Sequence, residues 1–425
     1  MSAAGTAPRR WARTPAVLVA IGTAVVLSGV GLAVSRPDMV ALAAPLALWA
    51  LGAVRAERRT EGAPPEIRIE GVPGDADLVV DEVSIDTGAD ATDLLVEQAE
   101  RRFTRVIVPG RTAFIARSRT RHSGPLDAVR VRGRALAADA GLTGPDGAPA
   151  VRRRAISPPV RQIRELPLAP RLSGMHGSHE GSRPGHGGDF RDIHPFAPGD
   201  ELRRVDWRAT ARAARRPGDL LVRRTHALSE ASVVIAMDAA DDLGEVVAMW
   251  GSADRTRSGA TSLDHAREAA RSLATAAVGA GDRVAYHVLD KAGRTVRGGT
   301  GSRHLARVVS AISSTGRAGD DSRYRRTPPV PQGSVIAVLS TFFDGAAADL
   351  AIMWRASGHR VIAVDTLPHL DAARLTPEQR LALRVLLAER DVVFRDLSSA
   401  GVDRVRWDDD AATALGVLAR SRAAR

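Results

Sequence analysis

The chain of 425 residues has no cysteine and only one lysine. Without cysteine it can form no disulfide, no thiolate metal site and no cysteine nucleophile. Because the one lysine lies in Asp290-Lys291-Ala292, the chain lacks the Gly-x-x-x-x-Gly-Lys-Ser/Thr sequence of a P-loop. It also lacks a Gly-x-Ser-x-Gly elbow, a His-Glu-x-x-His helix and a Gly-x-Gly-x-x-Gly fingerprint. The enzyme classes that depend on these motifs are disfavoured, so any ATP would have to be used by a partner.

Positive charge is abundant but spread along the chain. The formal net charge is +11, and basic proteins often bind nucleic acid or acidic lipid because clustered cations release counterions from polyanions. Here arginines occur in every segment, and aromatic residues are only 4% of the chain, which is few for base stacking. The Arg, Ala and Gly usage is typical of a GC-rich genome. We expect no nucleic acid, and keep an anionic-lipid or nucleic-acid binding protein as an alternative.

Two uncharged segments near the amino terminus predict membrane spans, at about residues 16–34 and 39–54. As helices they would be about 28 Å and about 24 Å long, so the first can cross a bilayer and the second, which contains Pro45, is marginal. The four-residue connection Ser35-Arg36-Pro37-Asp38 suits a tight turn. Residues 1–56 are therefore predicted to form a transmembrane helical hairpin.

Arginines flank the hairpin mainly on one side, because the connection between the spans carries only Arg36 against Asp38. Those outside the two spans are Arg9, Arg10, Arg13, Arg55, Arg58 and Arg59. The positive-inside rule then predicts a cell-membrane protein with two spans, whose termini and soluble domains are cytoplasmic. A cleaved signal peptide is the alternative, disfavoured because a second apolar segment follows the first at once.

Short β-type runs follow, separated by Gly, Pro and Asp. They are Ile67–Glu70, Leu78–Val80, Phe103–Val108, Ala113–Ala116 and Val129–Val131. Several short strands at this spacing predict a small β-sandwich domain over residues 64–156.

Residues 157–230 are predicted to be a connector that is rich in Pro, Arg, Gly and Ser at its start. It contains His176, His179, His186 and His194, and histidines close in sequence can bind zinc or nickel. The interpretation as an ordinary loop is favoured because metal ligands need a rigid backbone, which Gly and Ser do not provide.

From residue 231 to residue 425, β-branched runs alternate with amphipathic segments. The predicted strands are 233–237, 283–288, 335–339, 360–364 and 392–394, and the predicted helices are 263–278, 303–312, 346–356 and 377–389. This alternation is typical of an α/β domain with a largely parallel sheet covered on both faces. Ligand sites in such sheets lie at the carboxyl ends of the strands.

A dense motif covers residues 188–223, just before the α/β domain. Its most distinctive residues are Phe190, Phe196, Pro198-Gly199-Asp200, Arg203-Arg204-Val205-Asp206-Trp207, Ala209 to Arg212 and Leu221-Val222-Arg223. This motif resembles the signature of the DUF58 family, as does the layout of two spans, a β-rich region and an α/β domain. The resemblance implies a von Willebrand factor A-like (Rossmann-like) fold for residues 231–425. His194-Pro195 departs from the family pattern, in which Arg and a polar residue are expected.

Within the signature, Pro198-Gly199-Asp200 predicts a turn. The large ring of Trp207 is expected to be buried, inside a paired network of Arg203, Arg204, Asp206 and Arg212. The favoured interpretation is a structural brace between the connector and the sheet. A catalytic acid/base role for Asp200 or Asp206 is the alternative, disfavoured because carboxylates beside arginines are usually ion-paired.

The resemblance also implies a metal site. In von Willebrand A domains the first strand ends in Asp-x-Ser-x-Ser, which joins a Thr and an Asp from later loops. Here the strand ends Asp238-Ala239-Ala240-Asp241-Asp242, so Asp238 and Asp242 could bind Mg²⁺ and Ala240 could not. Thr300 resembles the threonine, whereas Ser340-Thr341 replaces the usual Ser-Asp. A degenerate Mg²⁺ site is one hypothesis, and Asp238 as a cap of the following backbone is the other.

The leading functional hypothesis is a non-enzymatic, membrane-anchored adaptor that binds a protein through the top of its A-like domain. The resemblance implies a MoxR-type AAA+ ATPase as the partner, in assembly or remodelling of envelope or metal-dependent complexes. A metal-dependent hydrolase using Asp200, Asp206 or Asp238 is the alternative from another class.

Overall fold

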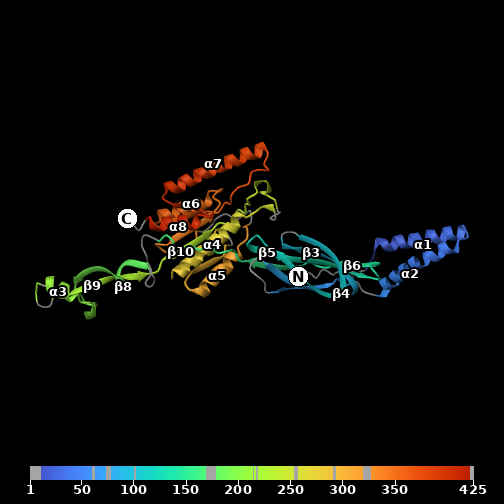
Figure 1. Ribbon diagram of the computed structural model, residues 1–425, viewed down its shortest axis with the longest axis horizontal. Helices are drawn as coiled ribbons and strands as arrows, with labels where there is room; N and C mark the ends of the chain where they lie inside the picture. Colours follow the sequence, from blue (N-terminus) through green and yellow to red (C-terminus); the bar gives the residue numbers. More distant parts are fainter. Residues whose placement is uncertain are drawn as a thin grey trace, which may run out of the picture. The chain divides into compact units, whose positions relative to one another are not determined.

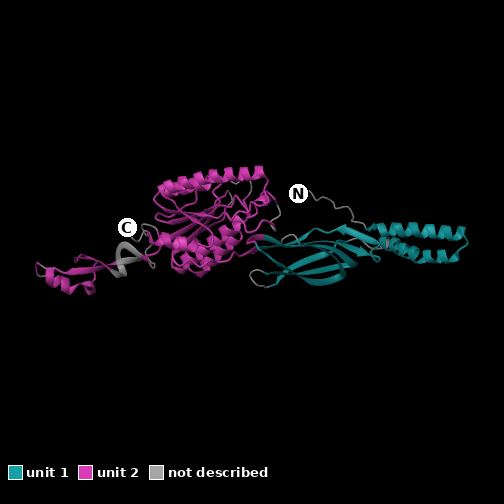
Figure 2. Ribbon diagram, turned by 45° about the horizontal axis from the view of Figure 1, so that its top comes forward, with its two compact units in different colours: residues 1–121, 126–154 teal, residues 122–125, 155–425 magenta. Residues whose placement is uncertain are grey.

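The computed structural model forms two compact units (Figure 2). Unit 1 comprises Met1–Arg121 and Leu126–Arg154, and unit 2 comprises His122–Pro125 and Ala155–Arg425. The residues that the structure describes are 11–59, 63–72, 78–99, 102–168, 179–213, 215–216, 219–252, 257–290, 293–318 and 327–421. His176, Arg9 and Arg10 lie outside the described residues.

Unit 1 begins with two apolar helices that are each long enough to cross a membrane, α1 (Pro15–Ala33) and α2 (Pro37–Arg59). The second span is longer than predicted, because Pro45 lies inside one continuous helix whose apolar stretch covers Pro37–Glu57. The two helices approach closely at their connection, where a Cβ on Gly31 would lie 2.9 Å from Val40 Cγ2. A small residue at such a crossing is typical of packed membrane helices.

The start of α1 and the end of α2 pack against the β-rich part of the same unit. Trp11, Val17 and Ala53 form a buried cluster with Ala135 and Leu142 from two strands. Just before α1, strand β1 (Ala12–Arg13) pairs with β6 (Leu142–Asp146). The helical hairpin is thus joined to the strands by a core, and not only by a flexible linker.

Seven strands of this region form one hydrogen-bonded set in the order β1-β6-β5-β3-β2, with β4 beside β3 and β7 beside β5. The remaining five are β2 (Glu66–Val72), β3 (Leu78–Gln98), β4 (Arg102–Arg119), β5 (Gly124–Ala137) and β7 (Ala150–Ile156). The long strand β3 pairs with β2 through its first half and with β5 through its second half.

Residues 103–108 and 113–116, predicted as separate strands, belong to one strand, β4. Pro109-Gly110 does not end that strand, because it lies opposite the irregularity in β3 between Asp86 and Ala91. A Cβ on Gly110 would nearly overlap the Ala89 carbonyl oxygen, so glycine lets the two backbones come together.

The α/β part of unit 2 is a six-stranded sheet in the order β12-β11-β10-β13-β14-β15. Neighbouring strands are parallel except for β12, which runs antiparallel to β11. The strands are β10 (Ser232–Met237), β11 (Arg283–Val288), β12 (Thr295–Gly299), β13 (Val335–Ser340), β14 (Arg360–Asp365) and β15 (Asp403–Arg406).

Helices cover both faces of this sheet (Figure 1). Because alternate residues of a strand point to opposite faces, Ile235 packs with α4 (Ser262–Gly279), α5 (Ser302–Ser313) and α8 (Ala411–Arg420). Val234 packs on the other face with α6 (Ala346–Ala356) and α7 (Pro377–Ser399). The prediction of an α/β domain with a largely parallel sheet is confirmed.

One predicted strand of this domain is wrong. Residues 392–394 belong to α7, and the strand beside β14 is β15. A capping box between Thr376 and Gln379 starts the helix, which buries Phe394 and leaves Val392 44% exposed. The apolar run at 392–394 therefore has helical rather than strand periodicity.

The predicted connector also contains regular structure. Strand β8 (His179–Pro195) pairs antiparallel with β9 (Leu221–Ser229), and among the described residues this two-stranded sheet has no further strand. Between the strands lie the 3-10 helix η2 (Leu202–Arg204) and the short helix α3 (Trp207–Ala213). The family-like signature is thus the end of a hairpin.

Candidate functional site

The hairpin closes through a turn at Ala197 to Asp200. Asp200 donates its backbone N–H to the Ala197 carbonyl oxygen (3.0 Å), and its carboxylate accepts the Ala197 N–H (2.9 Å). Gly199 has φ +99°, the conformation that follows proline in a type II turn. The sequence-predicted turn is confirmed, and the Asp200 carboxylate is part of it.

Asp206 starts helix α3. Its Oδ1 accepts the backbone N–H of Ala209 at 2.9 Å, which is the bond an N-cap residue makes, and its own N–H binds the Leu221 carbonyl oxygen at 2.8 Å. Thr210 Oγ1 accepts the Leu221 N–H at 3.0 Å. The Asp206 carboxylate therefore caps α3, and the Asp206 N–H and the Thr210 hydroxyl join the helix to Leu221 of β9 inside the hairpin.

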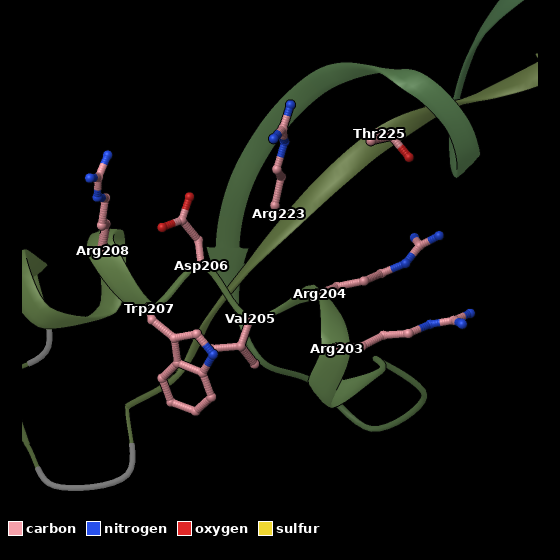
Figure 3. Close-up of a pocket in the computed structure, with 8 residues that line it drawn as sticks. All are labelled: Arg203, Arg204, Val205, Asp206, Trp207, Arg208, Arg223 and Thr225. Carbon is pink, nitrogen blue, oxygen red and sulfur yellow. The ribbon is translucent and has the colours of Figure 1, made fainter.

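Trp207 is not buried as predicted. Its residue is 66% exposed, and Figure 3 shows its ring pointing away from Asp206 and Arg223. The expected network around the ring is also absent among the described residues, because Arg203 Nε lies 2.7 Å and Arg204 Nε lies 3.5 Å from Glu201. The physical reason is that the described residues of this hairpin end form no core large enough for the ring, since Val205 and Val222 are the only apolar residues among them that are buried.

Other large apolar side chains are exposed around the same hairpin. They are Phe190 (51%), Ile193 (40%), Phe196 (38%) and Leu202 (66%), and together with Trp207 we call them the signature surface. All five come from one hairpin, and large apolar residues that are exposed together on a surface usually mark an interaction site.

Arginines surround the signature surface. The guanidinium of Arg223 lies 5.3 Å from the ring centre of Phe190, a cation–π contact. An open depression of about 580 Å³ is lined by Arg203, Arg204, Val205, Asp206, Trp207, Arg208, Arg223 and Thr225 (Figure 3). Between residues 190 and 225 there are nine arginines and five carboxylates, so this end of the hairpin is basic. An acidic partner with apolar anchors would be complementary to it.

A second group of polar residues lies at the carboxyl edge of the six-stranded sheet. Asp238 follows β10 and is 6% exposed. Its Oδ1 accepts the Ala240 N–H at 3.0 Å, and its Oδ2 accepts the Ser340 hydroxyl at 2.6 Å. Both carboxylate oxygens are therefore used inside the protein, as the capping interpretation of Asp238 required.

The loop after β13 lies at the same carboxyl edge of the six-stranded sheet. Thr341 Oγ1 donates to Asp241 Oδ2 at 2.9 Å, and Phe342 has φ +56°, which is strained for a residue with a side chain. Burial and the nearby charges of Asp238 and Asp241 raise the pKa of Asp344. The sequence did not single out Asp241, because the pattern Asp-x-Ser-x-Ser places its ligands at positions 238, 240 and 242.

The sequence-predicted magnesium ligands do not meet. Thr300 follows Gly299, which pairs with Val284 near the start of β11, whereas Asp238 lies beyond the end of β10. Because β12 runs antiparallel, it carries Thr300 to the opposite edge of the sheet from Asp238 and Asp242. In the described part of the chain, no three His, Cys, Asp or Glu residues are grouped so that they could hold a metal ion. The set Asp238, Asp242 and Thr300 does not fit Mg²⁺.

Most of the signature motif lies in a part of the chain that matches a known protein family. A family model described as "Protein of unknown function DUF58" matches residues 192–378. This match supports membership of the DUF58 family. No protein in the curated collection matches the chain.

The DUF58 match runs from β8 into the first turn of α7, so it contains most of the signature surface and the Asp238 edge. It ends before Arg390, a buried residue of α7 that sequence reasoning missed. Arg390 is paired with Asp365, donates from Nε to the Thr341 carbonyl oxygen at 2.6 Å, and lies 4.7 Å from the Phe394 ring centre. This arginine ties α7 to the loop after β13.

Proposed function

We propose that this protein is a membrane-anchored adaptor that binds a protein partner through the signature surface. The partner we propose is a MoxR-type AAA+ ATPase, acting in the assembly or remodelling of envelope or metal-dependent complexes. Because the chain lacks a P-loop, ATP hydrolysis belongs to the partner.

The observation that carries this proposal is the exposure of Trp207 on a backbone that is held rigidly. An indole ring that is 66% exposed costs solubility unless something covers it, and aromatic and Arg residues dominate the binding energy of protein interfaces. The Asp206 cap and the bond from Leu221 N–H to Thr210 fix α3, so the ring is presented in one place. A preformed anchor of this kind loses little entropy on binding.

The proposal moves the contact from the top of the α/β domain to the hairpin. Asp238 is almost fully buried and its oxygens accept internal hydrogen bonds, so it supports the edge loop and does not face a partner. Asp200 and Asp206 likewise bind backbone N–H groups. Carboxylates engaged in this way favour an adaptor over the metal-dependent hydrolase.

For the fold, we propose that the α/β part of unit 2 is von Willebrand factor A-like. Support comes from its strand order and from the antiparallel edge strand β12, a pattern in which the first strand lies at the centre of the sheet. We also propose that the β-rich part of unit 1 is a small sandwich. Support comes from β3, whose two halves pair with β2 and β5 on either side of an irregularity.

For the location, we propose that α1 and α2 span the cell membrane with both ends in the cytoplasm. Large aliphatic side chains along the helices are exposed, including Leu18 (60%), Val25 (66%) and Leu48 (68%), as expected for contact with lipid. Arg13 and Arg55 at the two helix ends support the cytoplasmic side. Both ends pack on the same strands, so the soluble units would lie on that side too.

The test is co-purification of the full-length protein from native membranes, with retained proteins identified by mass spectrometry. Wild-type protein is expected to retain the ATPase, and Trp207→Ser to lower its yield at least about tenfold, because an aromatic anchor contributes about 2 kcal/mol or more. Leu381→Ser is the matched control, since Leu381 on α7 is similarly exposed (59%) but lies outside the signature surface.

Equal ATPase yields from wild type and Trp207→Ser would contradict the proposed surface. Retention of no ATPase by wild type, under conditions in which other membrane complexes stay intact, would contradict the proposed partner. Loss of the partner in Leu381→Ser alone would place the contact on α7.

A further inference from the structure

A cavity of about 480 Å³ lies in unit 1 where the end of α2 meets the β-rich strands. Its apolar wall includes Trp11, Leu48, Trp49 and Ala53. Its polar rim includes Asp90 on β3 and Asp139 in the turn between β5 and β6. The cavity thus has one apolar side, on the last turns of a helix that is apolar enough to span a membrane, and one polar side on the strands.

Trp11, which lines this cavity, has an unused hydrogen-bond donor. The residue is 6% exposed, and its Nε1 has no hydrogen-bond partner among the described residues. A buried donor without an acceptor costs about 1–3 kcal/mol, so a ligand beside the Trp11 ring that supplies an acceptor would stabilise this part of unit 1. Esters and phosphates are acceptors of the right kind.

The place of the cavity along α2 indicates what that ligand is. Leu48 and Trp49 belong to the apolar stretch Pro37–Glu57, and Glu57 at its end pairs with Arg13 at 2.8 Å. This is the depth at which tryptophan rings lie at membrane surfaces, and at which the acyl chains of a lipid give way to its ester and phosphate groups. An occupant here needs an apolar tail beside α2 and an acceptor beside Trp11.

The rim selects the charge of the headgroup. Asp90 and Asp139 are exposed carboxylates, which attract an ammonium group and repel an anionic one. Asp139 is the middle residue of three successive positive φ angles, Ala138 (+52°), Asp139 (+52°) and Ala140 (+63°), in a turn held by the bond from Thr14 Oγ1 to the Ala140 carbonyl oxygen. The constrained backbone of this turn therefore places Asp139 at the rim of the cavity.

We propose that this cavity binds one glycerophospholipid with a primary ammonium headgroup, of the phosphatidylethanolamine type. The ammonium lies at Asp90 and Asp139, an ester or phosphate oxygen accepts the Trp11 N–H, and an acyl chain lies along Leu48 and Ala53. This proposal rests on the membrane location of α1 and α2, but on neither the partner nor the signature surface.

Two glycines leave room in the cavity and allow a sharp test. A Cβ on Gly52 of α2 or on Gly88 of β3 would meet nothing within 4 Å, so a leucine at either position fills the cavity without a clash at its Cβ. A Cβ on Gly22 of α1 is equally free, yet Gly22 is not part of the cavity wall. Gly22→Leu is therefore the matched control.

The experiment is native mass spectrometry of the full-length, detergent-washed protein titrated with dioleoyl phosphatidylethanolamine or dioleoyl phosphatidylglycerol. Wild type is expected to bind one phosphatidylethanolamine at least about tenfold more tightly than phosphatidylglycerol. Gly52→Leu and Gly88→Leu should each weaken that binding at least about tenfold, and Trp11→Phe, which removes only the N–H, about five- to tenfold. Gly22→Leu should bind as wild type does.

Equal binding of the two lipids by wild type would overturn the proposal, as would wild-type affinity in both cavity-filling variants. Circular dichroism identifies a variant that fails to fold, and the other variant then decides. Carbonate extraction of membranes separates this outcome from failure of the anchor: protein that stays in the membrane but shows no lipid preference overturns the lipid site alone, whereas protein released by carbonate overturns the anchor.

Discussion

Replacing Arg390 by methionine is expected to lower the local stability of the sheet edge by about 3–5 kcal/mol, the cost of removing one partner from a buried ion pair. The Arg390 side chain is 7% exposed and that of its partner Asp365 is 2% exposed. Methionine keeps most of the packing volume against Phe394 but leaves Asp365 with Arg404, at 3.0 Å, as its one ion-pair partner among the described residues. The Thr341 carbonyl oxygen also loses its donor.

Hydrogen–deuterium exchange of the full-length protein measures this loss where it occurs. Amides of β13 and β14 should exchange faster in Arg390→Met, while those of the β-rich unit should not change. Arg384→Met is the control, because Arg384 lies on the same helix and is exposed. Unchanged protection in β13 and β14 would show that α7 is held by its apolar face, and that the ion pair contributes little.

Replacing Arg154 by methionine is expected to destabilise the β-rich unit by a similar amount, about 3–5 kcal/mol at neutral pH. Asp81 is fully buried, with Arg154 Nη2 at 3.2 Å and Arg152 Nε at 3.8 Å from its Oδ1. Arg154 also donates to the Val80 carbonyl oxygen at 3.1 Å. Without it, a buried carboxylate keeps only the more distant of its two cations.

The cost of Arg154→Met should depend on pH in a defined direction. Burial raises the pKa of Asp81 above the ordinary 3.8, so this group stabilises the fold most below that value and the contribution is lost as pH rises through the folded pKa. Arg154 lowers the pKa of Asp81, so its removal raises that pKa further. The variant should therefore be weakest at neutral pH and approach wild type as pH falls toward 4.

Urea unfolding of the full-length protein at pH 7 and pH 4.5, followed by circular dichroism, tests both the loss of stability and its dependence on pH. Arg153→Met is the matched control, because Arg153 directly precedes Arg154 on β7. Its side chain is 83% exposed and pairs with Asp127 at the surface. A loss of stability that is the same at both pH values would mean that packing, and not the charge of Asp81, is responsible.

The α/β domain could be predicted because its signal is local and repeated. Each buried strand is a β-branched run, and each helix has an apolar face, so β10, β13 and β14 lie within one residue of their predicted bounds. The exception at 392–394 is a run of three apolar residues, too short to distinguish a strand from the end of a long helix.

The direction of a strand could not be predicted in the same way. Nothing in residues 295–299 distinguishes an antiparallel edge strand from a parallel one, yet this decides whether Thr300 lies beside Asp238 or at the far edge of the sheet. The adhesion-site hypothesis failed at that step. Asp241 and Thr341, which do meet, come from loops whose contact depends on tertiary structure.

Trp207 was misjudged for a different reason. A large ring is usually buried, and that rule assumes enough surrounding chain to cover it. The described part of the hairpin end has too little, so the residue expected in a structural network is, with Leu202, the most exposed of the signature surface. The turn at Pro198-Gly199 could be predicted because the residues that determine a turn are adjacent in the sequence.

Site-specific photocrosslinking in native membranes tests the adaptor function most directly. A benzophenone amino acid would be placed at position 207 in one variant and at position 381 in another, two exposed positions of unit 2. We expect position 207 to crosslink to one ATPase and position 381 to give no such product. Crosslinks to the ATPase from position 381 alone, or from neither position while the complex still co-purifies, would contradict binding through the signature surface.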